Sequence, residues 1–198
     1  MIQSGMDYDG QIFRDLEMIQ AQLSANTFDE CRFEGCRFNE SLFQNCRFVN
    51  TTFKNCDLSL VQIPACSFPG TRFENSKLIG INWAQANLPE KALWDPLVFK
   101  RCALNHSTFL GVNLRKVQMR RCEAVNVDFR EADLGEAAFP FTDLKESLFS
   151  ASDLSGADLS QARNYQIDPS QNKLKGAKFS LPEAMSLLYS MDIEIIDG

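Results

Sequence analysis

Residues 31–60 read CRFEG CRFNE SLFQN CRFVN TTFKN CDLSL, six blocks of five whose third residue is Phe or Leu. An apolar residue recurs at every fifth position well beyond this stretch. The first register runs from Phe13 to Leu88, and a second, one residue out of phase, runs from Phe99 to Leu159. A period of five fits neither the 3.6 residues of a helical turn nor the two residues of a strand. It predicts a repeating turn, and therefore a solenoid.

Two positions of each block are apolar or small: the central residue and the residue two places before it. Inward and outward side chains that alternate over three residues form a short strand, and the other two residues must turn the chain. One block therefore makes one side of a polygon. Phe13, Phe33, Phe53 and Phe73, each four blocks after the last, fall in one column, which indicates four sides per coil. We expect an all-β solenoid, a quadrilateral β-helix.

The phase slip and the ends divide a single domain, residues 1–198, into segments. We expect a first tower at 13–88, an interruption at 89–98, a second tower at 99–163, an irregular coil with the last repeats at 164–179, and a C-terminal cap and dimerisation tail at 180–198. Pro89 and Pro96 bracket good helix formers, so a helical turn that breaks the rod is favoured for the interruption. A one-residue bulge in an unbroken coil is the alternative.

The tail has the features of a cap. Ser180, Pro182 and Glu183 fit a capping box before a short helix, and a short Ile-rich strand follows it. A helix can cover the apolar core that a solenoid exposes at its end. The final strand then lacks a partner within one chain, which favours exchange between two chains over a purely intramolecular cap. We assign to this cap and dimer interface Met185, Leu187, Leu188, Tyr189, Met191, Ile193 and Ile195.

The seven cysteines do not indicate a metal or disulfide framework. Each stands two places before a central residue, a position otherwise filled mostly by Ser, Thr, Ala and similar small side chains, so Cys serves there as a small buried side chain. The odd count, the lack of a CxxC pair and the single histidine, His106, argue against zinc. No Gly-rich phosphate loop and no Ser-His-Asp arrangement is present. We expect a non-enzymatic protein without metal or cofactor.

Charge and hydropathy limit the partners. The formal net charge is −6 and the pI is near 4.9, which argues against direct nucleic-acid binding and favours a basic partner. No apolar stretch is as long as a membrane span, and the N-terminus lacks the pattern of a secretory signal. The expected location is the cytoplasm.

Acidic residues gather late in the chain. The nine between positions 123 and 158 are Glu123, Asp128, Glu131, Asp133, Glu136, Asp143, Glu146, Asp153 and Asp158. Two cations, Arg130 and Lys145, accompany them, which gives a local balance of −7 (2 − 9). With four blocks per coil Asp133 stacks on Asp153, so rows of negative charge are predicted on the sides of the rod. These rows are either a binding surface for a basic groove or a means of solubility.

The blocks of residues 31–60, together with ADLGE AAFPF TDLKE SLFSA SDLSG ADLSQ at 132–161, resemble the pentapeptide-repeat family. The resemblance implies a right-handed, four-sided β-helix. The acidic rows, the break near the middle and the end FSLPEAMSLLYSMDIEI resemble the members that protect type II topoisomerases, namely the quinolone-resistance proteins and the microcin and albicidin immunity proteins.

That closer resemblance implies a homodimer, joined at its C-terminal ends, that imitates duplex DNA in shape and charge. It also implies binding to DNA gyrase or topoisomerase IV, and protection of that enzyme from an antibiotic or toxin of the albicidin, microcin or fluoroquinolone type. The chain lacks the long loop insertions of the quinolone-resistance members, and its break at 88–99 is more like the albicidin-immunity type. The alternative function is a scaffold with a partner other than a topoisomerase.

Overall fold

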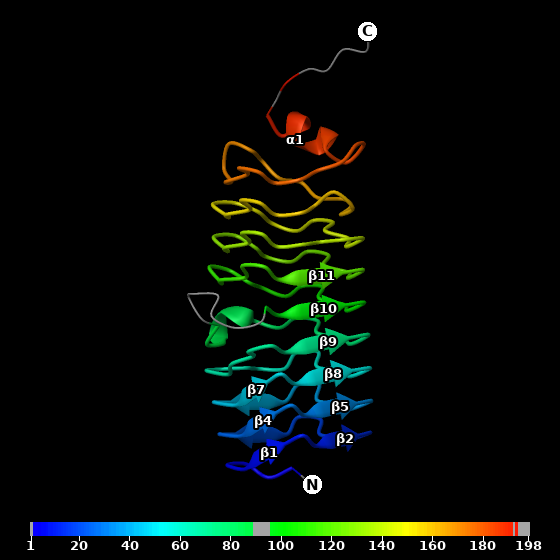
Figure 1. The fold of residues 1–198 in the computed structure, drawn as a ribbon, viewed down its shortest axis with the longest axis vertical. Helices are drawn as coiled ribbons and strands as arrows, with labels where there is room; N and C mark the ends of the chain where they lie inside the picture. The colour runs from blue at the N-terminus through cyan, green and yellow to red at the C-terminus, as the bar shows by residue number, and fades with distance from the viewer. Residues whose placement is uncertain (1, 89–95, 192, 194–198) are drawn as a thin grey trace.

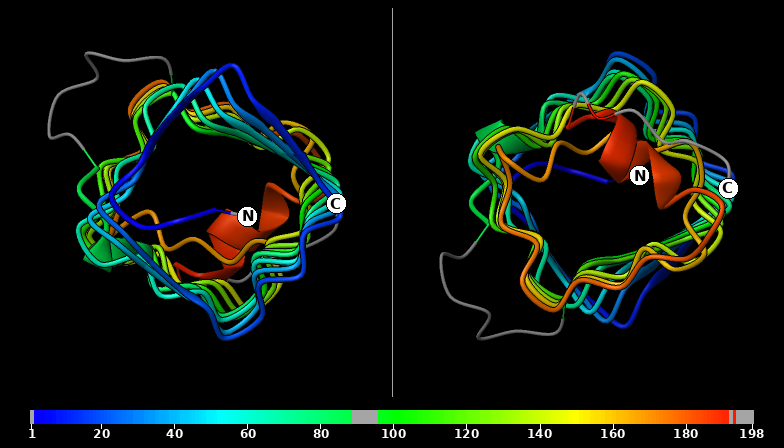
Figure 2. Two further views of the ribbon diagram at one scale, coloured as in Figure 1. Left: turned by 90° about the horizontal axis from the view of Figure 1, so that it is seen from below. Right: turned by 90° about the horizontal axis from the view of Figure 1, so that it is seen from above.

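The computed structural model describes residues 2–88, 96–191 and 193. The chain winds into a rod of stacked coils with the two termini at opposite ends (Figure 1). Seen along the rod, the coils superpose in a four-sided outline (Figure 2). The predicted right-handed quadrilateral β-helix is confirmed. No helix among the described residues is long and apolar enough to cross a membrane.

Short parallel strands form the sides. They are β1 (Asp7–Asp9), β2 (Ile12–Arg14), β3 (Gln22–Ser24), β4 (Thr27–Asp29), β5 (Arg32–Glu34), β6 (Leu42–Gln44), β7 (Arg47–Val49), β8 (Thr52–Lys54), β9 (Arg72–Glu74), β10 (Val98–Lys100) and β11 (Gln118–Arg120). The sheets run β1-β4-β7, β3-β6 and β2-β5-β8-β9-β10-β11. Partners within the first register are four blocks apart, as in Phe13↔Phe33 and Phe33↔Phe53. Single bridges at the same offset continue the ladders, for example Asp133↔Asp153.

Each side ends in a turn that needs one residue in the left-handed backbone region. In the turn after Phe38, the Ser41 amide donates to the Phe38 carbonyl at 3.0 Å, and Glu40 has a φ of 61°. Asparagine often fills this position, as Asn45 and Asn50 do with φ values of 54° and 48°. A positive φ costs Asn less than most residues, so the sequence lowers the strain of a corner that recurs in every block.

The core consists of columns of central residues. Phe28 and Phe48 stack with ring centroids 5.1 Å apart, and Phe33 and Phe53 stack at 4.8 Å. Neighbouring columns meet edge to face, as Phe28 and Phe33 do at 5.2 Å and 71°. Offset stacks and edge-to-face pairs are the preferred aromatic geometries. The period of five therefore predicted the core correctly.

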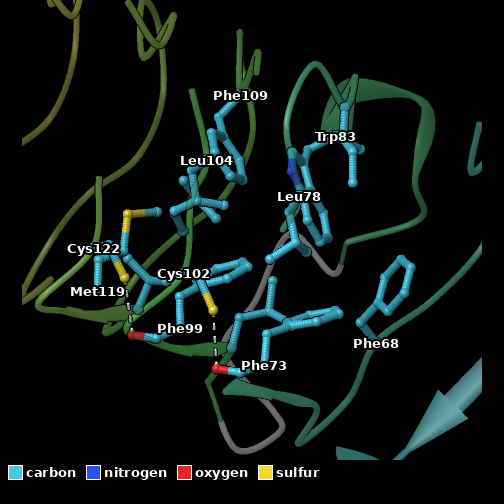
Figure 3. Close-up of a cluster of buried hydrophobic side chains, with 14 of the residues drawn as sticks. Phe68, Phe73, Leu78, Trp83, Phe99, Cys102, Leu104, Phe109, Met119 and Cys122 are labelled. Carbon is cyan, nitrogen blue, oxygen red and sulfur yellow. Dashed lines mark hydrogen bonds between the residues drawn. The ribbon is translucent and has the colours of Figure 1, made fainter. Parts of the chain in front are cut away.

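The cysteines lie in this core, as predicted: all seven are buried and unpaired by disulfides. Their thiols donate to carbonyl oxygens of the preceding coil, as Cys102 does to Phe73 at 3.3 Å and Cys122 to Phe99 at 3.4 Å (Figure 3). Buried Ser and Thr hydroxyls at the same position do likewise. Where this position holds Cys, Ser or Thr, the side chain thus ties adjacent coils together, whereas Val127 and Ala132 fill the same position by volume alone. Among the described residues no group of three potential ligands could hold a metal ion.

The expected break into two towers is not what the structure shows. The ladder passes from β9 to β10 with Phe73 opposite Phe99, so the coil that contains the interruption is longer than the regular coils. The second register nevertheless continues the same stack (Figure 1). A 3₁₀ turn, η1 (Trp83–Gln85), lies on the last side before the interruption. The helical turn expected within 89–98 falls mostly on 89–95, outside the described residues.

The stack begins before residue 13, the expected start. Strand β1 pairs with β4, and the ring of Tyr8 stacks on Phe28 at 5.2 Å. Near the other end, segment 164–179 keeps the regular offset through bridges such as Asp153↔Lys173. The buried side chains of Tyr165 and Ile167 fill the core of its irregular side.

Helix α1 (Met185–Tyr189) lies over the last coil (Figures 1 and 2), where Leu187 packs against the core. The helix predicted as a cap is therefore present, but the predicted capping box is wrong. The N-cap is Ala184, without a side-chain bond, because the Ser180 hydroxyl donates to the carbonyl of Ser160 in the preceding coil. The predicted final strand lies almost wholly at 192 and 194–198, outside the described residues.

Candidate interaction surface

The nine predicted acidic residues lie on the outer surface of the coils that span residues 123–158, and we call them the acidic band. Bridges place Glu123 beside Asp143 and Asp133 beside Asp153 in adjacent coils. The four glutamates are exposed and the five aspartates are half-buried. At the strand spacing of ~4.8 Å, each such pair brings two carboxylates of like charge close together.

The aspartates have a structural role that sequence reasoning missed. Asp133 Oδ1 accepts a hydrogen bond from the Gly135 amide at 3.0 Å, and Asp153 Oδ1 accepts one from the Ser155 amide at 2.9 Å. Asp128, Asp143 and Asp158 make the same bond to the amide two residues later. An Asx turn of this kind holds the corner of the coil. Part of the acidic band therefore exists because the turns need an acceptor.

These bonds favour the ionised carboxyl groups. The bonds from Arg130 hold the pKa of Asp128 below its ordinary value, despite partial desolvation. Hydrogen bonds from Ser155 lower the pKa of Asp153. For Asp158 the Ser160 hydroxyl, 2.6 Å from Oδ1, lowers the pKa. A hydrogen bond to the charged form stabilises that form, so these groups stay negative well into the acid range.

Cations of neighbouring coils neutralise part of the band. The Arg115 guanidinium forms ion pairs with Glu136 Oε1 at 2.7 Å and with Asp133 Oδ1 at 3.5 Å. Lys173 Nζ lies 3.6 Å from Asp153 Oδ2. Over residues 99–178 there are twelve basic and ten acidic residues, a balance of +2 (12 − 10). The acidic surface is therefore a band between basic coils and not the whole second tower. Counting the charges one coil before and one coil after each carboxylate would have found these pairs in the sequence.

The tail residues assigned to a dimer interface are only partly covered. Met185 and Leu187 are half-buried, whereas Tyr189 is 65% exposed and Met191 is 51% exposed. Leu188 and Ile193 are exposed as well, and Ile195 lies outside the described residues. A short helix thus covers the coil end with one face and leaves apolar side chains on the other. Exposed apolar clusters of this kind often mark interfaces.

The repeat also decides the relationship of the chain to known proteins. The family description "pentapeptide repeat region" matches residues 26–93, and "pentapeptide repeats (8 copies)" matches 98–135 and 128–163. The chain belongs to the pentapeptide-repeat family. Together the matches cover most of the stack on both sides of the interruption. No curated protein matches this pentapeptide-repeat chain in sequence.

Solved structures of other pentapeptide-repeat proteins share the fold. A trypsin-treated form of QnrB1, a plasmid-mediated fluoroquinolone resistance protein, is 17% identical with a TM-score of 0.73, over 98% of this chain and 99% of that one. HetL, involved in heterocyst differentiation regulation in the cyanobacterium Nostoc sp. strain PCC 7120, is also 17% identical, with a TM-score of 0.60 over 89% and 86% of the two chains. At this identity the likeness concerns the fold, which proteins of different roles share.

Proposed function

We propose that this chain is a non-enzymatic, cytoplasmic, DNA-mimicking protein that binds DNA gyrase or topoisomerase IV. In this role it protects the enzyme from a poisoning antibiotic or toxin. The observation that carries the proposal is the stacking of carboxylates in rows, Glu123 on Asp143 and Asp133 on Asp153, along a convex rod. A convex row of anions is complementary to a basic groove that binds DNA. The fold shared with a fluoroquinolone resistance protein supports the choice of partner.

The charge density of the band can be compared with that of duplex DNA. Residues 123–158 make slightly under two coils, or about 9 Å of rod at ~4.8 Å per coil. Duplex DNA carries about five negative charges over the same length, at one per ~1.7 Å. The band alone, at −7, exceeds this value. Its balance falls to −2 (−7 + 5) when the cations that pair with it from the neighbouring coils, Arg115, Lys116, Arg163, Lys173 and Lys178, are included. A basic groove would therefore have to compete with these cations for the carboxylates.

A homodimer joined at the tails would double the length of this surface. One coil, residues 159–179, separates the acidic band from α1, so a two-fold axis at the tail would place two bands along one rod, two coils apart. The exposed apolar side chains of Leu188, Tyr189 and Met191 are the contacts we propose for that interface. Two linked bands would bind a symmetric enzyme more tightly than one.

The test uses purified gyrase or topoisomerase IV in a DNA supercoiling or relaxation assay, with and without albicidin-type and quinolone inhibitors. Asp133→Asn with Asp153→Asn removes two charges but keeps the oxygen that caps each turn. We expect this pair to weaken enzyme binding by at least about tenfold, in line with the loss of close charge pairs at an interface. Asp57→Asn is the matched control, because Asp57 caps the same turn through Ser59 but lies outside the band.

Two results would contradict the proposal. One is no effect of the wild-type protein on enzyme activity or inhibition at micromolar concentration. The other is equal loss of binding in Asp57→Asn and in the band variant, which would assign the effect to the fold.

A scaffold with another partner is the second candidate function. The fold is also shared with HetL, whose role lies in heterocyst differentiation regulation, and the ion pairs of Arg115 and Lys173 are what a solubilising surface would contain. Affinity capture with the wild-type protein and with the band variant separates the two candidates. Recovery of a protein other than topoisomerase subunits, unaffected by the band variant, would favour the scaffold.

A further inference from the structure

Charges of opposite sign alternate along two outer columns of the first register. One column runs Glu17, Arg37, Asp57 and Lys77 through successive bridges, and Arg37 reaches Glu17 at 3.0 Å. In a neighbouring column Arg14 reaches Glu34 at 3.0 Å. Side chains directly opposite each other on adjacent strands attract when their charges differ and repel when they match. Alternation therefore makes each column a ladder of favourable pairs.

Cations, by contrast, stack on cations at a corner of the rod that we call the basic corner: Lys100, Arg101, Arg120 and Arg121. Lys100 lies opposite Arg120 in the β10–β11 ladder, and the Arg101 amide donates to the Arg120 carbonyl at 2.8 Å. All four side chains are exposed. Of these four cations, only Lys100 forms an ion pair within the described part of the chain: its Nζ lies 3.9 Å from a carboxylate oxygen of Glu74. The corner thus places cations opposite one another, with a single ion pair to offset their repulsion among the described residues.

Two shallow hollows open beside these cations. Arg101, Arg121 and Lys77 line the first, together with one carboxylate, that of Glu123. Arg121 and Arg163 line the second, where Glu123 and Asp143 balance their charge. Arg121 also lies over the exposed ring of Phe141, 5.2 Å from its centroid, so the ring holds the guanidinium in place while the N–H donors of Arg121 can still meet a ligand. The first hollow, with three cations and one carboxylate, therefore combines an excess of positive charge with space for an anionic side chain.

We propose that the basic corner docks a short acidic segment of a partner protein, two or three neighbouring Asp or Glu side chains. The four cations occupy only two coil levels, about 4.8 Å apart, so their charge is concentrated over the area of a few carboxylates. Guanidinium forks bind carboxylates through two parallel hydrogen bonds, and three of the four cations are arginines. Such a ligand would replace the repulsion between stacked cations by charge-assisted hydrogen bonds.

The surroundings of the corner disfavour nucleic acid as the occupant. Glu74 stands one coil away in the Lys100 column, and Glu123 follows Arg121 by two residues. A protein that binds a duplex through about six to ten phosphate contacts covers a long stretch of it. A duplex placed on the basic corner over that length would pass across these carboxylates. A short acidic segment needs only the first hollow, where three cations lie against the single carboxylate of Glu123. The corner and the Glu123–Asp143 row then form adjacent patches of opposite sign, which would fix the orientation of one partner.

Binding of a short acidic peptide tests the basic corner directly. A fluorescent hexapeptide of alternating Asp and Glu is titrated with the full-length protein and followed by anisotropy. We expect binding that weakens as salt rises from about 50 to about 200 mM. Arg101→Gln with Arg121→Gln should raise the dissociation constant at least about tenfold. Arg14→Gln with Arg37→Gln is the matched control, because these arginines belong to alternating columns.

A thermal melt of each variant accompanies the titration. Removing two of four stacked cations should leave the melting temperature unchanged or raise it, since like charges repel in the free protein. Equal peptide binding by the wild type and the corner variant would overturn the proposal. So would tighter binding of a duplex of about 20 base pairs, or of a phosphopeptide of the same length as the acidic peptide, because the corner would then select phosphate.

Discussion

The ring of Phe99 lies parallel to the ring of Phe73 in the preceding coil, with centroids 5.3 Å apart and 8° between the planes. Trp83 and Phe109 repeat this relationship across the same interruption, at 5.4 Å and 10°. The extra length of this coil is thus accommodated without a break in the core. The apolar columns, and not the local sequence at 89–98, decide that the two registers form one rod.

A double-mutant cycle on this pair measures how much of the rod's cohesion crosses the interruption. Phe73→Leu and Phe99→Leu are each expected to destabilise the protein by about 1 kcal/mol, with a coupling of about 0.5–1.5 kcal/mol from the lost ring stack. Urea unfolding of the four proteins provides the free energies. Phe33→Leu with Phe129→Leu, two rings that do not touch, should be additive within ~0.5 kcal/mol. Additivity at 73 and 99 would mean that the coils on either side of the interruption are energetically independent.

The small inward position offers a second test. The buried Ser147 hydroxyl donates to the Ala124 carbonyl at 2.6 Å and accepts from the Val127 amide at 3.1 Å. Ser147→Ala leaves both buried groups without a partner and should cost about 1–3 kcal/mol of unfolding free energy. Ser147→Cys, the residue found here in other coils, should cost less. Ser59→Ala, on the outward side of a turn, should stay within ~0.5 kcal/mol. An equal loss for Ala and Cys would show that volume, and not hydrogen bonding, selects this position.

The thiols give a third prediction. Burial raises the pKa of Cys31, whereas a hydrogen bond from the Cys56 thiol lowers the pKa of Cys36 to about 7. All seven side chains are buried, so no sulfur is accessible to a reagent in the native protein, whatever its protonation state. A thiol-specific reagent such as DTNB should label none of them within minutes under native conditions and all seven after denaturation in guanidinium. Fast labelling of even one cysteine in the native protein would place that coil outside the stable core.

The core was predictable because each block of five residues by itself shows which of its side chains point inward. A central residue and a small residue recur in every block, so residues as different as Phe28 and Cys31 could be placed inside without reference to the rest of the chain. The acidic band was only half predictable. Asp133 and Glu136 were recognised as outward, but their cation, Arg115, belongs to the preceding coil and enters only when coils are stacked.

Turn chemistry and the continuity of the rod across the interruption were the parts that sequence reasoning missed. Asp153 was assigned to a partner surface, although its oxygen also caps the turn through the Ser155 amide. The predicted break at 89–98 came from proline positions, which report local backbone preference. They carry no information on Phe73 and Phe99, whose stacking preserves the rod. Packing between distant residues overrides local preference where the two disagree.

The capped turns predict an acid-sensitive component of stability. The pKa values of Asp128, Asp153 and Asp158 are lowered in the folded protein, so the unfolded chain binds more protons near and below their ordinary value of 3.8. Their stabilisation is complete above that pH and is lost as the pH falls through the lower folded values. Melting temperatures from neutral pH to about pH 2 should show this decline. Replacing the three by Asn should flatten it, and an unchanged acid slope in that variant would contradict the assignment.

The exposed side of α1 predicts how the molecule associates. Leu188 and Met191 are 38% and 51% exposed on the face away from the core, so Leu188→Glu with Met191→Glu should disrupt the proposed dimer with little effect on the stack. A central apolar contact contributes about 2 kcal/mol to an interface, so each change should raise the dimer dissociation constant about thirtyfold. Light scattering coupled to size exclusion measures the mass of each species. Leu60→Glu is the control, because Leu60 is 55% exposed on a coil far from the tail. A double variant that stays dimeric would place the interface elsewhere on the rod, and a wild-type protein that is monomeric at high micromolar concentration would exclude the dimer itself.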